Sequence, residues 1–310
     1  MSKILITGGA GFIGSNLVDV LISAGYQVVI IDNLVTGKKE YLNPQAKFYQ
    51  ADICSSEIAA IFTAERFDYV YHLAAQIEVA KSVADPVYDN AVNILGALNI
   101  LANCQKNKVK KIIFSSTGGA IYGEAEEIPT PETAPAYPVS PYGIHKLTFE
   151  KYLNYYYQIF GQDYAILRFA NVYGPRQYRG GEAGVISIFI ANAILNKTSF
   201  LYGDGQQTRD YVYVADVVKA LVLVKDIEAR GEINISTARE INLWQIIASI
   251  EKTLGQPIII EQKTAKLGEQ RRSCLSYERA RTVLNWLPEV DLALGIKNTL
   301  AWAKDNKNNL

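Results

Sequence analysis

The sequence predicts an α/β protein in which a doubly wound parallel sheet is followed by a smaller C-terminal α/β lobe. Short apolar segments alternate with amphipathic helical segments up to about residue 170, and a glycine-rich turn joins the first strand to the first helix. Such alternation is typical of a parallel sheet covered by helices on both faces. After residue 170 the alternation loosens. We therefore expect one domain over 1–170 and a second lobe over 171–310, whose chain crosses back to the first domain.

The expected strands are short apolar runs of the kind that is buried in a parallel sheet. They lie at 3–7, 27–31, 46–50, 68–72, 111–115 and 163–169, and the helices between them lie at 12–25, 55–63, 87–107 and 141–160. In the second lobe, a loop rich in glycine and proline comes first. Isolated strands are then expected at 233–236 and 257–261.

Length and composition bound the possible functions. A chain of 310 residues with 49% hydrophobic residues can bury a large core. Lys+Arg and Asp+Glu balance at 31 each, so nucleic acid and anionic membranes are not expected partners. No apolar run reaches transmembrane length, and the first segment reads as a strand rather than a signal peptide. The three scattered cysteines suggest reduced thiols and a cytoplasmic protein, and the two histidines belong to no metal-ligand cluster, so no metal is expected.

The glycine-rich turn predicts a dinucleotide site. Gly8, Gly11 and Gly14 follow the first strand and open the first helix, and Asp32 ends the second strand 18 residues after Gly14. Glycines here allow a tight turn and close approach of the backbone to a pyrophosphate, while the helix N-terminus faces the phosphates. A carboxylate at the Asp32 position accepts hydrogen bonds from ribose hydroxyls and repels a 2′-phosphate. We therefore expect a Rossmann-type sheet that binds NAD rather than NADP.

Tyr142 and Lys146 form a candidate acid–base pair. They are one helical turn apart and so lie on the same helix face. A free phenol has a pKa of about 10, and a neighbouring ammonium group favours the phenolate. Such a pair can take a proton from a hydroxyl group and return it. Because the chain has 20 tyrosines, this spacing alone would equally fit a solvated helix face, and the interpretation depends on the other motifs.

Hydroxyl side chains follow the strand expected at 111–115. Ser115, Ser116 and Thr117 come at its carboxyl end, which is the edge where open α/β sheets bind ligands. Serine and threonine at a strand end are most often turn formers. Tyr142 follows 25 residues after Thr117. Together with Tyr142, these residues suggest a hydroxyl group that contacts the reacting oxygen. Thr117 is the first candidate and Ser116 the second.

Together these segments resemble the extended short-chain dehydrogenase/reductase family, and within it the NAD-dependent nucleotide-sugar epimerases of the UDP-glucose (UDP-galactose) 4-epimerase type. The resemblance covers essentially the whole chain. It rests on segments 7–14, 72–75, 115–117, 140–146, 168–176 and 203–212, which occur in the family's order.

The resemblance implies roles for individual residues. Tyr142, Lys146 and Thr117 would be catalytic. The cofactor contacts would be Gly8, Gly11, Phe12, Ile13, Gly14, Asp32, Asn33, Asp52, Ile53, Leu73, Ala74, Ala75, Asn93, Ser115, Tyr142 and Lys146. The substrate contacts would be Thr117, Tyr142, Asn171, Val185, Tyr202, Arg209, Lys266, Glu269 and Ser273.

The phosphate contacts leave alternatives open. Arg209 matches the family's phosphate clamp, although without the surrounding motif an ion pair with Asp210 would be the simpler interpretation. The family's second arginine is replaced by Lys266. Lysine keeps the charge but loses the planar fork of donors. Either Lys266 therefore holds the phosphate less tightly, or Arg271 or Arg272 supplies the contact.

The implied activity is that of a UDP-hexose 4-epimerase, which interconverts UDP-glucose and UDP-galactose. Tyr142 would take the proton of the sugar 4-hydroxyl while the C4 hydrogen passes to NAD, and the 4-keto sugar would turn over before it is reduced on its other face. Family decarboxylases and dehydratases carry an acidic residue beside the Ser/Thr segment, whereas Gly118 and Gly119 follow Thr117 here. The alternatives are another nucleotide-sugar enzyme (decarboxylase, dehydratase, glucuronate 4-epimerase) and a dinucleotide-sensing protein without activity.

Two finer expectations concern the sugar and the oligomer. In the family, the residue seven positions after the second arginine lines the pocket beside the sugar 2-substituent. Counted from Lys266, this residue is Ser273, or Cys274 if the alignment slips by one position. Both are small enough to leave room for the N-acetyl group of UDP-GlcNAc and UDP-GalNAc. The helices at 87–107 and 141–160 correspond to the family's four-helix dimer interface. The second carries more aromatic surface than one buried face needs, so a homodimer is expected.

Overall fold

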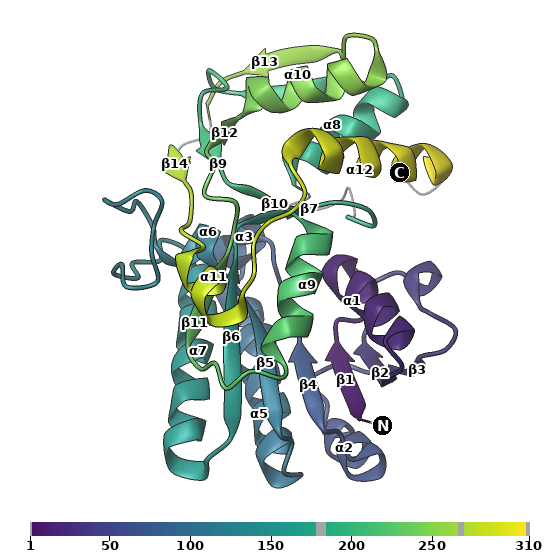
Figure 1. Cartoon of the computed structure of the whole chain (residues 1–310), viewed down its shortest axis with the longest axis vertical. Coiled ribbons are helices and arrows are strands. Elements are labelled where there is room, and N and C mark those ends of the chain that lie inside the picture. Colours follow the sequence, from purple (N-terminus) through teal and green to yellow (C-terminus); the bar gives the residue numbers. More distant parts are fainter. Residues whose placement is uncertain (1, 178–183, 266–269, 308–310) are drawn as a thin grey trace.

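A seven-stranded parallel sheet forms the centre of the larger part of the molecule (Figure 1). The computed structural model describes residues 2–177, 184–265 and 270–307. The strands are β1 (Lys3–Thr7), β2 (Gln27–Asp32), β3 (Lys47–Gln50), β4 (Tyr69–His72), β5 (Lys111–Thr117), β6 (Asp163–Phe169) and β11 (Glu232–Ile235). They lie in the order β11-β6-β5-β4-β1-β2-β3, and each pairing is parallel. The doubly wound fold predicted from the sequence is confirmed.

Helices cover both faces of this sheet because successive strand side chains point to opposite sides. Ile4 and Ile6 of β1 pack in one core, and Leu5 packs in the other. The first face carries α1 (Phe12–Ser23), α9 (Val214–Val224) and α11 (Glu278–Leu284), and the second carries α2 (Ile58–Glu65), α5 (Ala97–Lys106) and α7 (Pro141–Phe160) (Figure 1).

The helix predicted over 87–107 is not one regular α-helix. It consists of α4 (Pro86–Asn90), a π-helical segment η2 (Ala91–Gly96) and α5. A Cβ on Gly96 would lie 2.7 Å from Cγ1 of Ile53, so the glycine lets this segment approach the end of β3 closely. A short helix α3 (Val79–Ala84), which the sequence did not predict, precedes α4.

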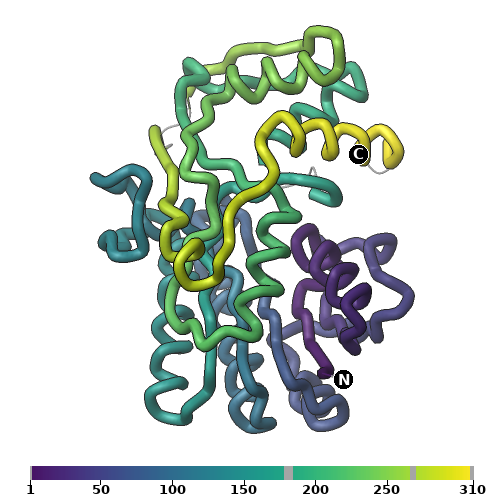
Figure 2. Tube along the Cα trace, viewed as in Figure 1, coloured from purple at the N-terminus to yellow at the C-terminus, as the bar shows by residue number. Residues whose placement is uncertain are grey.

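The second lobe lies beyond the carboxyl ends of the strands (Figures 1 and 2). Its sheets are small: β10 (Tyr211–Tyr213) pairs with β7 (Asn171–Tyr173), β13 (Ile260–Lys263) pairs with β8 (Ser199–Tyr202), and β9 (Thr208–Arg209) lies between β12 (Ile241–Asn242) and β14 (Arg272–Ser273). The remaining elements are α8 (Val185–Ile194), α10 (Leu243–Leu254) and α12 (Leu292–Asp305) in the lobe, and η1 (Lys39–Tyr41) and α6 (Gly118–Ile121) in the larger part.

One strand assigned to the lobe from the sequence was misplaced. The segment predicted at 233–236 forms β11, which is the edge strand of the main sheet beside β6 rather than an isolated strand. It continues the parallel sheet because α9 returns the chain along the same face as α1. Across the described residues, no helix combines the length and the apolar character that a membrane span requires.

Candidate active site

A cavity of about 600 Å³ lies at the carboxyl ends of the central strands. Strand ends are where open α/β sheets bind ligands, because the loops that follow the strands diverge there. Apart from Asn93, every residue predicted to contact the cofactor lines this cavity, and Thr117 lines it too. The set is Gly8, Gly11, Phe12, Ile13, Gly14, Asp32, Asn33, Asp52, Ile53, Leu73, Ala74, Ala75, Ser115, Thr117, Tyr142 and Lys146.

The glycine turn forms a cradle that side chains would fill. A Cβ on Gly14 would lie 2.1 Å from the carbonyl oxygen of Gly8, and Gly8 itself has φ +73° with Ala74 N only 2.7 Å from its Cβ position. Helix α1 starts at Phe12, and its N-cap residue, Gly11, offers no side-chain acceptor. The first backbone N–H groups of α1 are therefore available to an anion at the cavity.

The ribose side of the cavity is set by Asp32 at the end of β2. Its carboxylate accepts hydrogen bonds from the backbone N–H groups of Ala10 (3.0 Å) and Leu34 (2.8 Å). A carboxylate offers about four acceptor positions, so Asp32 can still accept from ribose hydroxyls. Burial raises the pKa of Asp32, while the two backbone donors act in the opposite direction.

Gln177, which the sequence did not single out, also lines the cavity. Its Nε2 donates to the carbonyl of Val172 (3.0 Å), whereas its Oε1 is buried without a hydrogen-bond partner among the described residues. A buried acceptor of this kind is costly unless a ligand donor satisfies it. The glycine cradle, the ribose-side carboxylate and this acceptor together fit NAD.

A second group that was missed follows β4. Gln76, Ile77, Glu78, Lys81 and Tyr88 line the cavity, and the Lys81 ammonium lies 4.5 Å from the centroid of the Tyr88 ring. The available signal was topological: this segment leaves a central strand at the same edge as the glycine turn. The predicted contacts after β4 end at Ala75, whereas the cavity lining continues along the loop and into α3 and α4.

Asn93 lies one layer behind the cavity wall. Its side chain accepts from the backbone N–H of Gln76 (3.1 Å) and donates to the Gln76 carbonyl (2.9 Å) and to Asp89 (3.1 Å). The π-helical segment η2 carries Asn93 towards that loop. In the structure Asn93 supports Gln76, which does line the cavity, and its role as a cofactor contact stays a prediction.

Tyr142 and Lys146 both reach the cavity from the first turns of α7. Ser140 caps this helix by accepting from Gly143 N (3.2 Å). A Cβ on Gly143 would lie 2.4 Å from the Ala120 carbonyl oxygen, so the glycine lets α7 pack against the segment that follows β5. The local sequence thus fixes both the start and the depth of the helix that carries the pair.

The Lys146 ammonium is buried between β5 and α7. It donates to the Ser115 carbonyl (2.8 Å) and lies 5.9 Å from the centroid of the Tyr142 ring. Burial lowers the pKa of Lys146 to about 7, while the carboxylates of Asp89 and Glu150 act in the opposite direction. Lys146 can therefore change its charge near neutral pH, on the same helix face as the phenol that it would activate.

The two candidate hydroxyls at the end of β5 point in different directions. Ser116 donates to Glu150 (2.6 Å), whose carboxylate is also held by Arg168. Thr117 Oγ1 lies 3.9 Å from the position that a Cβ would take on Gly119. Strand alternation accounts for the split, because neighbouring side chains face opposite sides of the sheet.

The predicted substrate residues of the lobe lie beyond this cavity lining. Asn171 begins β7, and its Oδ1 is 3.8 Å from the same Gly119 Cβ position, so it converges with Thr117. Val185 begins α8, and Tyr202 ends β8 with 36% of its surface exposed. Lys266 and Glu269 lie outside the described residues.

Arg209 and Ser273 are brought together by strand pairing. They are direct partners in the parallel ladder between β9 and β14. The chain then continues to Leu275, which packs against Gly118: a Cβ there would lie 2.2 Å from Leu275 Cδ1. Ser273 therefore lies two residues before a side chain that packs against the residue following Thr117.

The simpler interpretation of Arg209 as an ion-pair partner of Asp210 is wrong. Asp210 is buried and accepts instead from the backbone N–H and the hydroxyl of Thr237 and from Ala238 N. Of the two further phosphate candidates, Arg272 is paired with Glu240 (2.6 Å) and Arg271 lies 3.4 Å from Asp204.

Comparisons with known proteins agree with this geometry. The NAD dependent epimerase/dehydratase family matches residues 4–236. UDP-glucose 4-epimerase from Thermotoga maritima, solved with UDP-glucose, is 44% identical with a TM-score of 0.94, covering 98% of this chain and 99% of that one. UDP-glucose 4-epimerase from Thermus thermophilus, solved with NAD, is 39% identical with a TM-score of 0.93, covering 97% and 98%.

A third similar structure is that of an enzyme named for a different sugar. UDP-N-acetylglucosamine 4-epimerase from Methanobrevibacter ruminantium is 33% identical with a TM-score of 0.93, covering 98% of this chain and 99% of that one. Identity at this level over the whole chain extends the family match to the lobe as well as the sheet. The chain belongs to the NAD dependent epimerase/dehydratase family.

Proposed function

We propose that this protein is an NAD-dependent UDP-hexose 4-epimerase that interconverts UDP-glucose and UDP-galactose. The observation that carries the proposal is the convergence of Tyr142, Lys146 and Thr117 on the wall of a cavity that fits NAD. Gly8, Gly11 and Gly14 with Asp32 would hold the cofactor. When bound there, NAD supplies the chemistry of accepting the C4 hydrogen of the sugar and giving it back.

The chain's own residues would move and hold the proton of the sugar 4-hydroxyl. Tyr142 takes this proton as a phenolate and returns it, and the Lys146 charge stabilises that phenolate. Thr117 hydrogen-bonds the 4-oxygen. Ser116 is not assigned this role because its hydroxyl is held by Glu150. On the lobe, Arg209 with Asn171, Val185 and Tyr202 would hold the nucleotide diphosphate.

Decarboxylase and dehydratase chemistry is disfavoured at the reacting end of the cavity. Those reactions need an acidic group beside the Ser/Thr segment. The residue there is Gly118, and a Cβ on it would lie 2.2 Å from Leu275 Cδ1, so a larger residue would force Leu275 to move. The test is to add UDP-galactose, UDP-glucuronate or a dTDP- or GDP-hexose to the purified protein. We expect UDP-glucose from UDP-galactose without net consumption of cofactor. Carbon dioxide release, a 4-keto-6-deoxy product, or binding without turnover would each reject the assignment.

Ser273 supports a wider sugar range. Its small side chain would leave room for an N-acetyl group at the sugar C2 position. The β9–β14 ladder pairs Ser273 with Arg209, and Leu275, two residues later, packs against Gly118. We therefore propose that UDP-GlcNAc and UDP-GalNAc are substrates as well. The similarity to an N-acetylglucosamine 4-epimerase supports this extension.

We also propose a homodimer formed through α7 and the segment 87–107. On α7, Ile144, Tyr152, Tyr155 and Ile159 recur on one face and are 48%, 37%, 50% and 60% exposed. Leu95 of the neighbouring segment is 58% exposed. An apolar stripe of this kind typically marks a protein interface. Other apolar side chains of α7 face the core: Leu153 is fully buried, and Tyr156 and Tyr157 pack against the same core half-buried.

Light scattering should give a particle of twice the 34.4 kDa chain mass. The double variant Tyr155→Glu/Ile159→Glu should be monomeric, because the charges would face each other across the interface, and a monomeric wild type would reject the dimer.

Cys54, Cys104 and Cys274 are free thiols. Reduced thiols suit the cytoplasm, where we propose that the enzyme serves galactose metabolism.

A further inference from the structure

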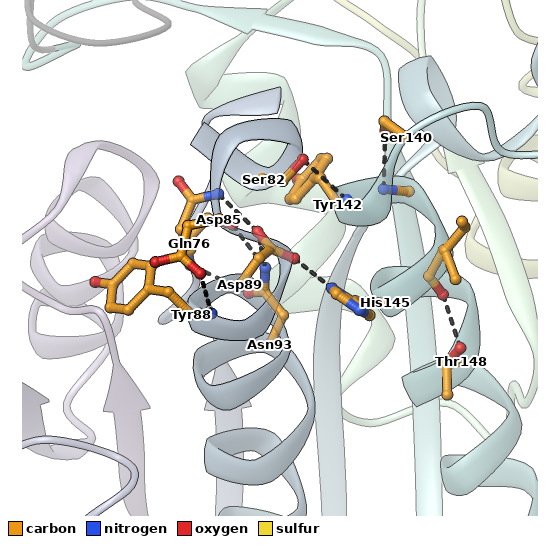
Figure 3. Close-up of polar contacts among 12 residues, drawn as sticks. Gln76, Ser82, Asp85, Tyr88, Asp89, Asn93, Ser140, Tyr142, His145 and Thr148 are labelled. Atoms are coloured by element: carbon orange, nitrogen blue, oxygen red, sulfur yellow. Dashed lines mark hydrogen bonds and ion pairs between the residues drawn. The ribbon is translucent and has the colours of Figure 1, made fainter. Parts of the chain in front are cut away.

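A buried carboxylate joins the cavity wall to the helix that carries the catalytic pair (Figure 3). Asp89 of α4 has no exposed surface. Its Oδ1 accepts from Gln76 Nε2 (2.6 Å) and Asn93 Nδ2 (3.1 Å), and its Oδ2 lies 2.5 Å from His145 Nδ1. Because a carboxylate has no proton to give, the imidazole N–H is the donor in that contact.

His145 lies between Tyr142 and Lys146 on α7, so this bond acts directly on the catalytic turn. A second contact has the same effect: Tyr142 N donates to Ser82 Oγ on α3 (3.2 Å). On the other side of Asp89, Gln76 lines the cavity, and its backbone is held by Asn93. The first turn of α7 and the loop after β4 thus share one buried anchor.

Resting on the proposed function, we propose that Asp89 is a positioning residue for the epimerase: through His145 and Gln76 it fixes α7 against the cavity wall and places a negative charge where it acts on Lys146. Asp89 touches neither reacting atoms nor cofactor in this arrangement. It works through the two residues that it holds.

The other charge near Lys146 is already neutralised. Glu150 of α7 forms a buried ion pair with Arg168 of β6, with Oε2 and Nη2 2.5 Å apart. His72 of β4 is neutral, because burial and the Lys146 charge lower its pKa to about 3. The remaining titratable groups on the elements packed against the start of α7 are Lys81 on α3, Tyr88 on α4 and Asp85, which caps α4.

The sign of the Asp89 effect follows from this arrangement. Burial lowers the pKa of Lys146, so the ammonium form is lost as pH rises, and the Asp89 carboxylate opposes that loss. Replacing Asp89 by the neutral Asn of similar shape should therefore move the loss of the ammonium form to lower pH. The Lys146 ammonium group would then stabilise the Tyr142 phenolate over a narrower pH range.

The test follows Lys146 directly, by NMR titration of 13Cε-lysine in the NAD-loaded protein, with the resonance assigned from Lys146→Met. Asp89→Asn should lower the Lys146 titration midpoint, shift the alkaline limb of the kcat profile to lower pH, and reduce kcat at neutral pH about tenfold with KM nearly unchanged. The matched control is Asp216→Asn, another buried carboxylate, which accepts from Glu289 N and Val290 N on the opposite face. It should leave the midpoint where it is.

A midpoint that is equal in wild type and Asp89→Asn, or one that moves equally in Asp216→Asn, would overturn the proposal. Because NMR reads Lys146 without turnover, this outcome is separate from a failure of the proposed activity. If Asp89→Asn does not fold, the kcat values of two His145 variants test the proposal instead. His145→Asn keeps a donor near the Nδ1 position and should retain kcat within about threefold, whereas His145→Leu should lose about tenfold. Equal activity of these two variants would contradict the inference.

Discussion

The cofactor side and the substrate side of the site are assembled differently. On the cofactor side, Gly14 and Asp32 come from one strand–turn–helix–strand unit, and both are fixed by contacts within it, to Gly8 and to Ala10. On the substrate side, Arg209 meets Ser273 only because β9 and β14, strands of two residues each, pair across 64 residues of chain. Local backbone geometry thus determines the first half, and long-range pairing determines the second.

This difference separates the expected effects of mutations. A change on the cofactor side should act on NAD retention, and a change on the lobe should act on substrate binding or choice. The catalytic turn of α7 lies where the halves meet, so a change there should act on turnover alone. The four predictions below test this separation, beginning with the largest effect.

Tyr142→Phe should lower kcat by about a thousandfold or more, because the ring and its packing remain while the proton acceptor is gone. NAD content and UDP binding should stay close to wild type, as measured by cofactor extraction and calorimetry. Retention of more than about a tenth of kcat, a barrier change of about 1.4 kcal/mol, would show that Tyr142 is not the base.

Gly14→Ala should lose most of the bound NAD. Its Cβ would lie 2.1 Å from the Gly8 carbonyl oxygen, so α1 and the turn must separate, at a cost of about 1–3 kcal/mol. The control is Gly119→Ala, whose Cβ would meet its nearest neighbours at 3.8 and 3.9 Å. The NAD released from each denatured protein is measured. Equal amounts of NAD from both variants would contradict the role of the glycine turn in holding the cofactor. Recovery of mainly NADP from wild type would separately overturn the role of Asp32.

Arg209→Gln should raise KM for the UDP-sugar about tenfold or more, since charge-assisted bonds to phosphate contribute roughly 1.5–3 kcal/mol. NAD content should not change. Arg271→Gln is the matched control on the same lobe, because Arg271 is exposed and lies 3.4 Å from Asp204. If Arg271→Gln has the larger effect on KM, the phosphate clamp has been assigned to the wrong arginine.

Ser273→Tyr should have the smallest effect on the parent reaction and a selective effect on the N-acetyl sugars. A tyrosine would fill the space proposed for the sugar 2-substituent, and steric exclusion exceeds the roughly 1–3 kcal/mol available from one methylene contact. The ratio of kcat/KM for UDP-GalNAc to that for UDP-Gal should fall sharply. If the wild-type protein has no activity on UDP-GalNAc, the proposal that N-acetyl sugars are substrates is wrong.

The same contrast explains what could be predicted from the sequence. The six strands up to β6 and the glycine turn were predictable because each is a local pattern, and the lining of the cavity by Asp32 and Ser115 followed from strand ends. The position of β11 in the main sheet could not be predicted, since its partner β6 precedes it by more than 60 residues. The π-helical turn around Asn93 and the Asp89–His145 contact depend on packing between helices, which periodicity does not report.

One partial signal was available but unused. Alternation along β5 places Ser115 and Thr117 on one side and Ser116 on the other, which separates the two candidate hydroxyls once the strand is known to extend to Thr117. The strand was predicted to stop at 115, so the alternation was not extended to Ser116 and Thr117. An error of two residues at a strand end was enough to leave the choice open.

The most direct test of the account uses UDP-galactose labelled with deuterium at C4. The purified protein, without added cofactor, is incubated with this substrate in ordinary water, and the products are followed by NMR. If NAD held in the cavity takes and returns the C4 hydrogen while Tyr142 handles only the hydroxyl proton, UDP-glucose should form with the deuterium still at C4. Failure to form UDP-glucose, or formation of UDP-glucose that has exchanged its label with water, would contradict the account.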